Sequence, residues 1–323
     1  MFKPTRILVF ALTIVLCIGA AHARQFQSSD VEAPDHPAVR SVAFMGELMR
    51  QRSSGRLWIS DVGASDHNSE IFTVAQLRTG TLDMARISVT ALHGSVPVTE
   101  VPTLPFLFAS TAHRRRVLVG PVGAELLASL EAYDLIGLCF YDAGARSIYM
   151  PTKAVRTPAD MKGLKIRVIQ SDLFVAMVEA LGANPTPMPY GEVYTALKTG
   201  IVDAAENNWP SYESSRHFEV AKYYAITEHS LAPEILLFSK KVWDTLSADD
   251  QKIIRQAAKE SVPYMRKLWD EREAKSRKIV EGAGSQIVTV QKKPFQDAMK
   301  PVYDKFITDP ALKDMIRRIQ AVQ

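Results

Sequence analysis

The binding chemistry of this chain gathers around one arginine and one short run of polar residues. Arg167 follows Ile166 on an expected strand with apolar surroundings, where an unpaired guanidinium would be costly. Farther along the chain, a second expected strand ends in the polar triplet Glu206-Asn207-Asn208. Guanidinium and amide groups at the ends of neighbouring strands can bind a carboxylate through hydrogen bonds without reacting with it. The pattern therefore predicts a site for an acidic small molecule.

Both features also have an ordinary structural explanation. Arg167 could be a partly exposed strand-end arginine that pairs with a local acid such as Asp172. The asparagines could belong to a common loop before Trp209-Pro210. Arg167 alone slightly favours the structural explanation, and the polar triplet shifts the balance toward a carboxylate site.

No catalytic or metal-binding motif competes with this interpretation. The sequence contains no Gly-x-Ser-x-Gly turn, no His-Glu-x-x-His helix and no glycine-rich phosphate loop followed by Lys-Ser or Lys-Thr. Its seven histidines are scattered, and no pair has the spacing of two metal ligands on one helix. The sequence gives no positive sign of an enzyme, and we expect neither a cofactor nor a metal.

Residues 1–23 have the pattern of a signal peptide. Lys3 and Arg6 precede an almost wholly apolar run, and Ala21-His22-Ala23 offers the small-x-small pattern that signal peptidase recognises. We expect cleavage after Ala23 and export to the periplasm, with an uncleaved anchor as the second possibility. Losing the two basic residues lowers the formal charge from +4 to about +2. This balance gives no indication of nucleic-acid binding.

Short apolar strands alternate with amphipathic helices along most of the chain. The expected strands are 56–62, 84–89, 135–141, 147–151, 166–169, 186–188, 201–205 and 234–239. The expected helices are 39–52, 69–79, 112–132, 172–181 and 190–199. Residues 100–108 carry two prolines, so we expect an extended crossing there. The alternation predicts α/β units with parallel, doubly wound sheets.

A much longer helix is expected near the end of the chain. From Ser247 to Val280, charged and apolar residues alternate at helical spacing. Such a helix could run the length of two domains. Pro263 lies within it and would remove one backbone hydrogen bond, so we expect a kink near that residue.

Several segments together resemble the solute-binding subunits of tripartite ATP-independent periplasmic (TRAP) transporters, of the DctP type. The segments are QLRTGTLDMARIS, VPTLPFLF, GARSIY, GLKIRV, ALGANPTPMPYGEVYTALKTGIVD, ENN, FEVAKYYAITEHS and LSADDQKIIRQAAKES, and they cover nearly all of the mature chain. The resemblance implies an α/β, two-lobed periplasmic binding protein (type II-like), with the long kinked helix spanning both lobes. Lobe I would comprise residues 24–145 plus about 233–272, and lobe II residues 146–232 plus about 273–323, with the ligand cleft between them.

The resemblance also implies which residues contact the ligand. The arginine of GLKIRV, here Arg167, forms the main salt bridge to the ligand carboxylate, and Asn207 supports the same group. The arginine of GARSIY, Arg146, often lies nearby. The remaining candidates are polar or aromatic residues expected to face the cleft: Tyr190, Glu70, Ser88, Asn208, Glu206, Asp35 and His36.

One departure from the family pattern bears on the ligand. Many relatives carry QENP where this chain has AENNW, and Phe where it has Tyr190. The ENN form, with Glu228-His229 downstream, resembles members that take sugar acids such as hexuronates. We therefore expect a monomeric receptor that delivers a uronate or related organic acid to a TRAP permease. A C4-dicarboxylate receptor is the alternative. A periplasmic sugar-acid enzyme using Glu206 or His229 as a base is less favoured, and a sensory subunit would share the same fold.

Overall fold

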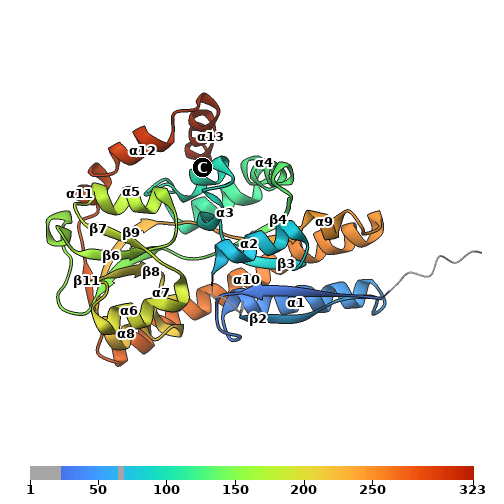
Figure 1. The fold of residues 1–323 in the computed structure, drawn as a ribbon, viewed down its shortest axis with the longest axis horizontal. Helices are drawn as coiled ribbons and strands as arrows, with labels where there is room; N and C mark the ends of the chain where they lie inside the picture. Colours follow the sequence, from blue (N-terminus) through green and yellow to red (C-terminus); the bar gives the residue numbers. More distant parts are fainter. Residues whose placement is uncertain (1–22, 65–68) are drawn as a thin grey trace, which may run out of the picture.

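The computed structural model describes residues 23–64 and 69–323, which form two α/β units built on separate sheets (Figure 1). The expected signal peptide lies outside the described residues except for Ala23. Across the described part of the chain, no helix combines the length and the apolar character needed to cross a membrane.

The first unit has a five-stranded sheet with the order β2-β1-β3-β10-β4. Its strands are β1 (Arg24–Asp30), β2 (Leu57–Ala64), β3 (Met84–Ser88), β4 (Leu135–Tyr141) and β10 (Glu234–Ser239). β1 is parallel to β2 and β3, whereas β10 is antiparallel to both β3 and β4. The expectation of a parallel sheet is therefore wrong for β10. This strand returns from the second unit and enters between two earlier strands in the opposite direction.

Helices cover both faces of this sheet. They are α1 (Pro37–Arg52), α2 (Glu70–Thr79), α3 (Thr111–Val119), α4 (Pro121–Ser129) and α9 (Lys240–Trp243), with the 3₁₀ helices η1 (Val89–Leu92), η2 (Pro97–Thr103) and η3 (Leu130–Tyr133). On one face, Met45 of α1 packs in the same buried cluster as Phe26 and Phe238 of the sheet. On the other, Leu77 of α2 shares a cluster with Ile87 of β3.

Two local expectations are wrong in this unit. The helix expected over 112–132 is divided into α3, α4 and η3. The first break falls at Gly120-Pro121, because proline has no N–H to donate and starts a new helix well. Within residues 100–108, expected to be an extended crossing, residues 100–103 instead form the end of η2 (Pro97–Thr103), which has Pro97 in its first turn.

The second unit has a four-stranded sheet with the order β11-β9-β5-β8 and a separate parallel pair, β6-β7. Its strands are β5 (Arg146–Met150), β6 (Lys165–Val168), β7 (Asn184–Pro187), β8 (Ala205–Asn207), β9 (Tyr223–Ser230) and β11 (Gln286–Thr289). Its helices are η4 (Pro158–Met161), α5 (Asp172–Ala180), η5 (Tyr190–Glu192), α6 (Val193–Thr199), α7 (Trp209–Ser214), α8 (His217–Val220), α11 (Lys293–Asp297), α12 (Lys300–Phe306) and α13 (Pro310–Gln320). In the four-stranded sheet, β5 is antiparallel to both β8 and β9, so the expectation of a parallel sheet is wrong here too. A parallel bridge between Ile166 and Ala204 places β6 beside the start of β8.

The long helix α10 (Ala248–Gly282) spans both units. It runs for 35 residues and begins at Ser247, whose side chain accepts a hydrogen bond from the backbone N–H of Asp250. It packs against α1 and β4 of the first unit and against α7 of the second (Figure 1). The expected helix across both units is confirmed. Pro263 lies inside α10 without ending it, and a bend there stays a prediction.

The connection from β4 to β5 passes close over α10 at Gly144. This residue has φ +64°, and a Cβ added to it would lie 3.0 Å from the indole ring of Trp269 and 3.0 Å from Glu273 Oε1. Trp269 is itself fully buried in the core on that side. Only glycine therefore combines the required backbone conformation with the available space.

We predict that Gly144→Ala lowers the free energy of unfolding by about 1–3 kcal/mol, because it adds a steric clash to the strain of positive φ. Denaturant unfolding measures this change. Gly182→Ala is the matched control, because Gly182 has φ +80° but nothing within 4 Å of its added Cβ. Equal losses in the two variants would show that packing on α10 contributes nothing.

Candidate ligand-binding cleft

A cavity lies between the two units and is lined by side chains from both. It has about 580 Å³ of space free of protein atoms, its mouth included. Among the expected site residues, those that line it are Arg167, Asn207, Arg146, Tyr190, Glu70, Ser88 and Asn208. Lining residues that the sequence did not single out are Val31, Glu32, Ile71, Arg86, Ala91, Ile169, Gln170, Met188, Pro189, Ser211 and Glu234.

Arg167 is a buried cation without a carboxylate partner. It sits on β6 with 3% of its surface exposed, and its Nε and Nη2 donate to the carbonyl oxygen of Met188 at 3.1 and 2.8 Å. Within the described residues, no acid lies within ion-pair distance of it, so the pairing with Asp172 is not formed. Burial lowers the pKa of Arg167, although the nearby Glu206 opposes this shift. An arginine stays protonated in proteins, so the cleft contains an uncompensated positive charge.

Arg146 lines the same cleft, but its charge is neutralised by Glu206. Arg146 Nε and Nη2 donate to the two carboxylate oxygens of Glu206 at 2.5 and 2.7 Å. His229 Nε2 lies 3.3 Å from Glu206 Oε2. Burial alone would raise the pKa of Glu206, but the Arg146 charge and the hydrogen bonds from His229 and Arg146 hold it at about 2. Glu206 is thus a buried counterion of Arg146, and it does not line the cavity.

The two asparagines after Glu206 are oriented by the backbone. The Oδ1 atom of Asn207 accepts from the backbone N–H of Asn208 at 2.9 Å. The Oδ1 atom of Asn208 accepts from the N–H of Ser211 at 2.8 Å and so caps α7. Because both amide oxygens are used in this way, the Nδ2 donors are left for the cavity, and no described residue accepts from them. One free guanidinium and two fixed amide donors form a site suited to an anion.

The opposite side of the cleft carries a third buried arginine, Arg86, whose charge is already paired with acids. Its Nε donates to Asp30 Oδ2 at 2.8 Å, and its Nη2 contacts the other oxygen of Asp30. Its Nη1 donates to Glu234 Oε2 at 2.8 Å and lies 4.0 Å from Glu70 Oε1. Arg86 follows Ala85 on an apolar strand, the same signal that drew attention to Arg167, and the sequence analysis missed it.

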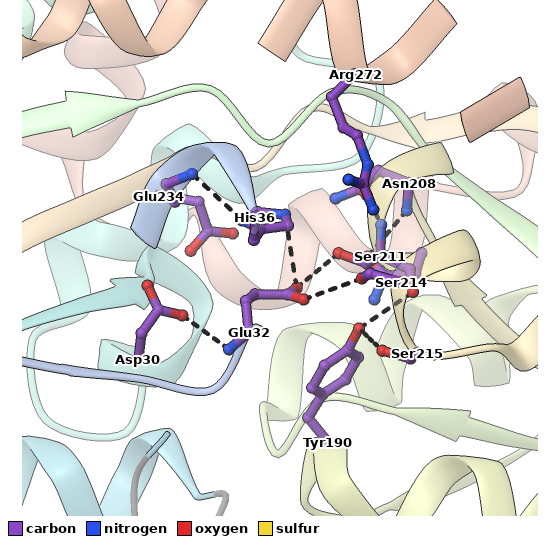
Figure 2. A network of polar contacts seen from close by, with 12 residues as sticks. Asp30, Glu32, His36, Tyr190, Asn208, Ser211, Ser214, Ser215, Glu234 and Arg272 are labelled. Carbon is purple, nitrogen blue, oxygen red and sulfur yellow. Dashed lines mark hydrogen bonds and ion pairs between the residues drawn. The ribbon is translucent and has the colours of Figure 1, made fainter. Parts of the chain in front are cut away.

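A contact between the two units runs through Glu32, at the end of β1 (Figure 2). Glu32 Oε1 accepts from Ser211 Oγ at 2.7 Å, and Oε2 accepts from Ser214 Oγ at 3.4 Å. The hydroxyl of Tyr190 donates to the carbonyl of Ser211 at 3.3 Å and also contacts Ser215. The N-terminal turn of α7 therefore meets the first unit at the edge of the cavity.

Asp35 and His36, which follow Glu32 in the chain, do not line the cavity. The carboxylate of Asp35 is largely exposed and accepts from Arg272 Nη1 at 2.8 Å. His36 is buried as the N-cap of α1, where its Nδ1 accepts from Ala38 N at 3.3 Å, and its Nε2 lies 4.0 Å from Glu32. A ligand contact by either residue stays a prediction.

Glu70 is an acid whose surroundings disfavour its charge. Burial raises its pKa to about 8, with Glu234 and Glu32 adding to the effect. The N–H of Ser88, which donates to Glu70 Oε1 at 2.8 Å, and the charge of Arg146 act in the opposite direction. The folded protein therefore holds this proton across neutral pH, and the carboxyl group presents both a donor and an acceptor to the cleft.

We predict that Glu70→Gln removes a loss of stability at rising pH. Between its ordinary pKa of 4.5 and its raised pKa of about 8, Glu70 is protonated when folded and ionised when unfolded. The free energy of unfolding of the native protein should therefore fall across this window, and that of the variant should fall less. Urea unfolding at several pH values measures the difference. The exposed Glu271→Gln serves as the control, and parallel curves for Glu70→Gln and the native protein would contradict the prediction.

Within the described ranges, 23–64 and 69–323, no group of three His, Cys, Asp or Glu side chains is placed to hold a metal ion.

Comparison with known proteins identifies the family. The model of the bacterial extracellular solute-binding protein family 7, DctP, matches residues 28–309. A solved TRAP periplasmic solute-binding protein from Bradyrhizobium sp. BTAi1, in complex with α/β-D-galacturonate, is 60% identical. The match covers 92% of this chain and 99% of that one, with a TM-score of 0.90.

Two further relatives are also periplasmic binding proteins. A Roseobacter denitrificans TRAP periplasmic solute-binding protein with bound β-D-glucuronate is 37% identical, covering 93% of this chain and 100% of that one, with a TM-score of 0.90. The 2,3-diketo-L-gulonate-binding periplasmic protein YiaO of Escherichia coli is 35% identical over 280 residues, which are 86% of this chain and 85% of that protein. With its two-lobed α/β fold and its spanning helix, the chain belongs to the DctP family of periplasmic solute receptors, which work with TRAP permeases.

Proposed function

We propose that this protein is a periplasmic receptor that binds a hexuronate and delivers it to a TRAP permease. The observation that carries the proposal is the buried guanidinium of Arg167, which has no acid partner and lies with the free amide donors of Asn207 and Asn208 around one cavity. A ligand carboxylate would supply the missing negative charge. The galacturonate and glucuronate bound by the similar structures carry one such carboxylate and a ring of hydroxyl groups.

The far side of the cavity suits those hydroxyls. The carboxyl of Glu70, the hydroxyl of Ser88 and the carboxylate of Glu234 line it, and each can accept a hydrogen bond from a hydroxyl group. A plain C4-dicarboxylate would offer fewer partners to these groups. We therefore place a hexuronate first and keep a C4-dicarboxylate or other organic acid as the alternative.

In the proposed mechanism, the protein has two lobes with the boundaries expected from the sequence, and these lobes close on the bound ligand. Lobe I would hold residues 24–145 and about 233–272, and lobe II residues 146–232 and about 273–323. The separate sheets support this division, since β1–β4 and β10 form one and β5, β8, β9 and β11 form the other. Ligand would bind Arg167 first, and closure would add contacts from lobe I, so the ligand favours the closed form by its differential affinity.

The proposal includes a cleavable signal peptide, a monomeric state and no nucleic-acid partner. It also includes the absence of catalysis. The nominal bases are poorly placed for proton transfer, because Glu206 is held ionised by Arg146 and His229 is engaged with Glu206. A general base needs a pKa near the working pH, and that of Glu206 is about 2.

We predict that Arg167→Ala weakens D-galacturonate binding by about 3–5 kcal/mol, because the ligand carboxylate would then be buried without its charge partner. Isothermal titration calorimetry on the mature protein measures this loss. Lys165→Ala is the control, because Lys165 lies on the same strand but is exposed. Near-native affinity in Arg167→Ala would refute the carboxylate assignment.

A thermal-shift screen of uronates, aldonates and dicarboxylates tests the ligand class. A true ligand at a hundredfold excess over its dissociation constant should stabilise the native protein by about 2.7 kcal/mol. The same ligand should produce no shift in Arg167→Ala. A dicarboxylate that shifts the midpoint more than any uronate would favour the alternative receptor.

A further inference from the structure

We propose that the cleft accepts one carboxylate only, and that Glu32, together with the acids paired with Arg86, excludes a ligand bearing a second. The inference rests on the proposed function and adds a rule of selectivity to it: a hexuronate binds, and the corresponding hexaric acid, with a carboxylate at each end, does not.

The first step is the charge balance on the second unit. Arg146 forms a bidentate pair with Glu206, so the pair contributes little net charge to the cavity. Arg167 has only the Met188 carbonyl as its described acceptor. This side of the cleft therefore offers the equivalent of one free positive charge, which one carboxylate neutralises.

The second step is the charge balance on the first unit. Arg86 is the only cation lining that side of the described cavity, and its three nitrogens already contact Asp30, Glu234 and, at 4.0 Å, Glu70. Its positive charge is already paired with acids of the protein. Two acids bound closely to one guanidinium leave this group of side chains with negative charge in excess.

The third step is the contribution of Glu32. Its carboxylate lines the cavity, accepts from the neutral hydroxyls of Ser211 and Ser214, and lies 4.0 Å from Nε2 of His36, a residue that does not line the cavity (Figure 2). Glu70 keeps its proton at neutral pH, so it supplies no positive charge that could pair with a second carboxylate. A second ligand carboxylate placed here would meet like charges in a buried site, and such juxtaposition costs several kcal/mol.

Hydroxyl groups meet the opposite situation. Carboxylate oxygens accept hydrogen bonds from hydroxyls, and charge-assisted bonds of this kind are strong. The same side chains that repel a carboxylate therefore favour the polyhydroxylated part of a sugar acid. The charge gradient also fixes the orientation of the ligand, with its carboxylate toward β6 and its hydroxyls toward β3 and β10.

Calorimetry with the mature protein and three related ligands tests the proposal. D-galacturonate has one carboxylate on a ring, galactonate has one on an open chain, and galactarate has two on an open chain. We expect galactarate to bind at least about 30-fold more weakly than galacturonate and at least about tenfold more weakly than galactonate. Equal or tighter binding of galactarate would overturn the inference. Equally weak binding of galactonate and galactarate would assign the rejection to the open chain and would also overturn it.

A conservative variant tests the residue. Glu32→Gln keeps an oxygen for Ser211 and removes the negative charge. It should narrow the ratio of galactonate to galactarate affinity, and the control Glu271→Gln should not. An unchanged ratio in Glu32→Gln would refute the role of Glu32. Failure of all three sugar acids to bind the native protein would instead refute the proposed function, which separates the two outcomes.

Discussion

The site depends on one buried charge that the protein leaves unpaired. Arg167 is desolvated on β6, and its backbone acceptor, the Met188 carbonyl, cannot neutralise a guanidinium. A folded chain of marginal stability tolerates such a group only where the surrounding structure fixes it. β6 is fixed by its pairing with β7 and by the bridge from Ile166 to Ala204. On the proposed function, the unfavourable burial of Arg167 without an acid partner is what makes a ligand carboxylate favourable there.

Three buried arginines in or beside the cleft show how partners decide the role of a residue type. Arg86 is paired with Asp30 and Glu234, and Arg146 with Glu206. Arg167 differs in having no acid partner among the described residues. On the proposed function, the anion therefore binds to the arginine that lacks an acid on the neighbouring strands, and the other two arginines are structural charges that shape the field around it.

The sequence could predict that Arg167, Asn207 and Asn208 come together around one cavity, because strand ends and polar triplets are local patterns. It also predicted α10 and β4, which have long periodic or apolar segments. It could not predict that β10 inserts antiparallel between β3 and β4, since strand order is set by distant pairing. β1 was missed because RQFQSSD is polar and lies directly after the apolar leader. Arg86 carries the same local signal as Arg167, but its role depends on its contact with Glu234, which is far away in the chain. The role of Glu32 likewise depends on its distant contact with Ser211, so neither role could be predicted from local sequence.

The division of labour in the cleft follows from which unit holds which charge. The free positive charge and the amide donors all belong to the second unit, so in the proposed movement a carboxylate can bind there before the units close. Glu70, Ser88 and Glu234 belong to the first unit, so on the same proposal their hydrogen bonds to hydroxyls form on closure. The carboxylate would then supply capture, and the hydroxyls would supply the differential affinity that selects the closed form. An acid without hydroxyls would bind to Arg167 and add no hydrogen bond to the first unit. The contact of Glu32 with Ser211 would then be the only hydrogen bond between cavity-lining residues of the two described units in the closed form.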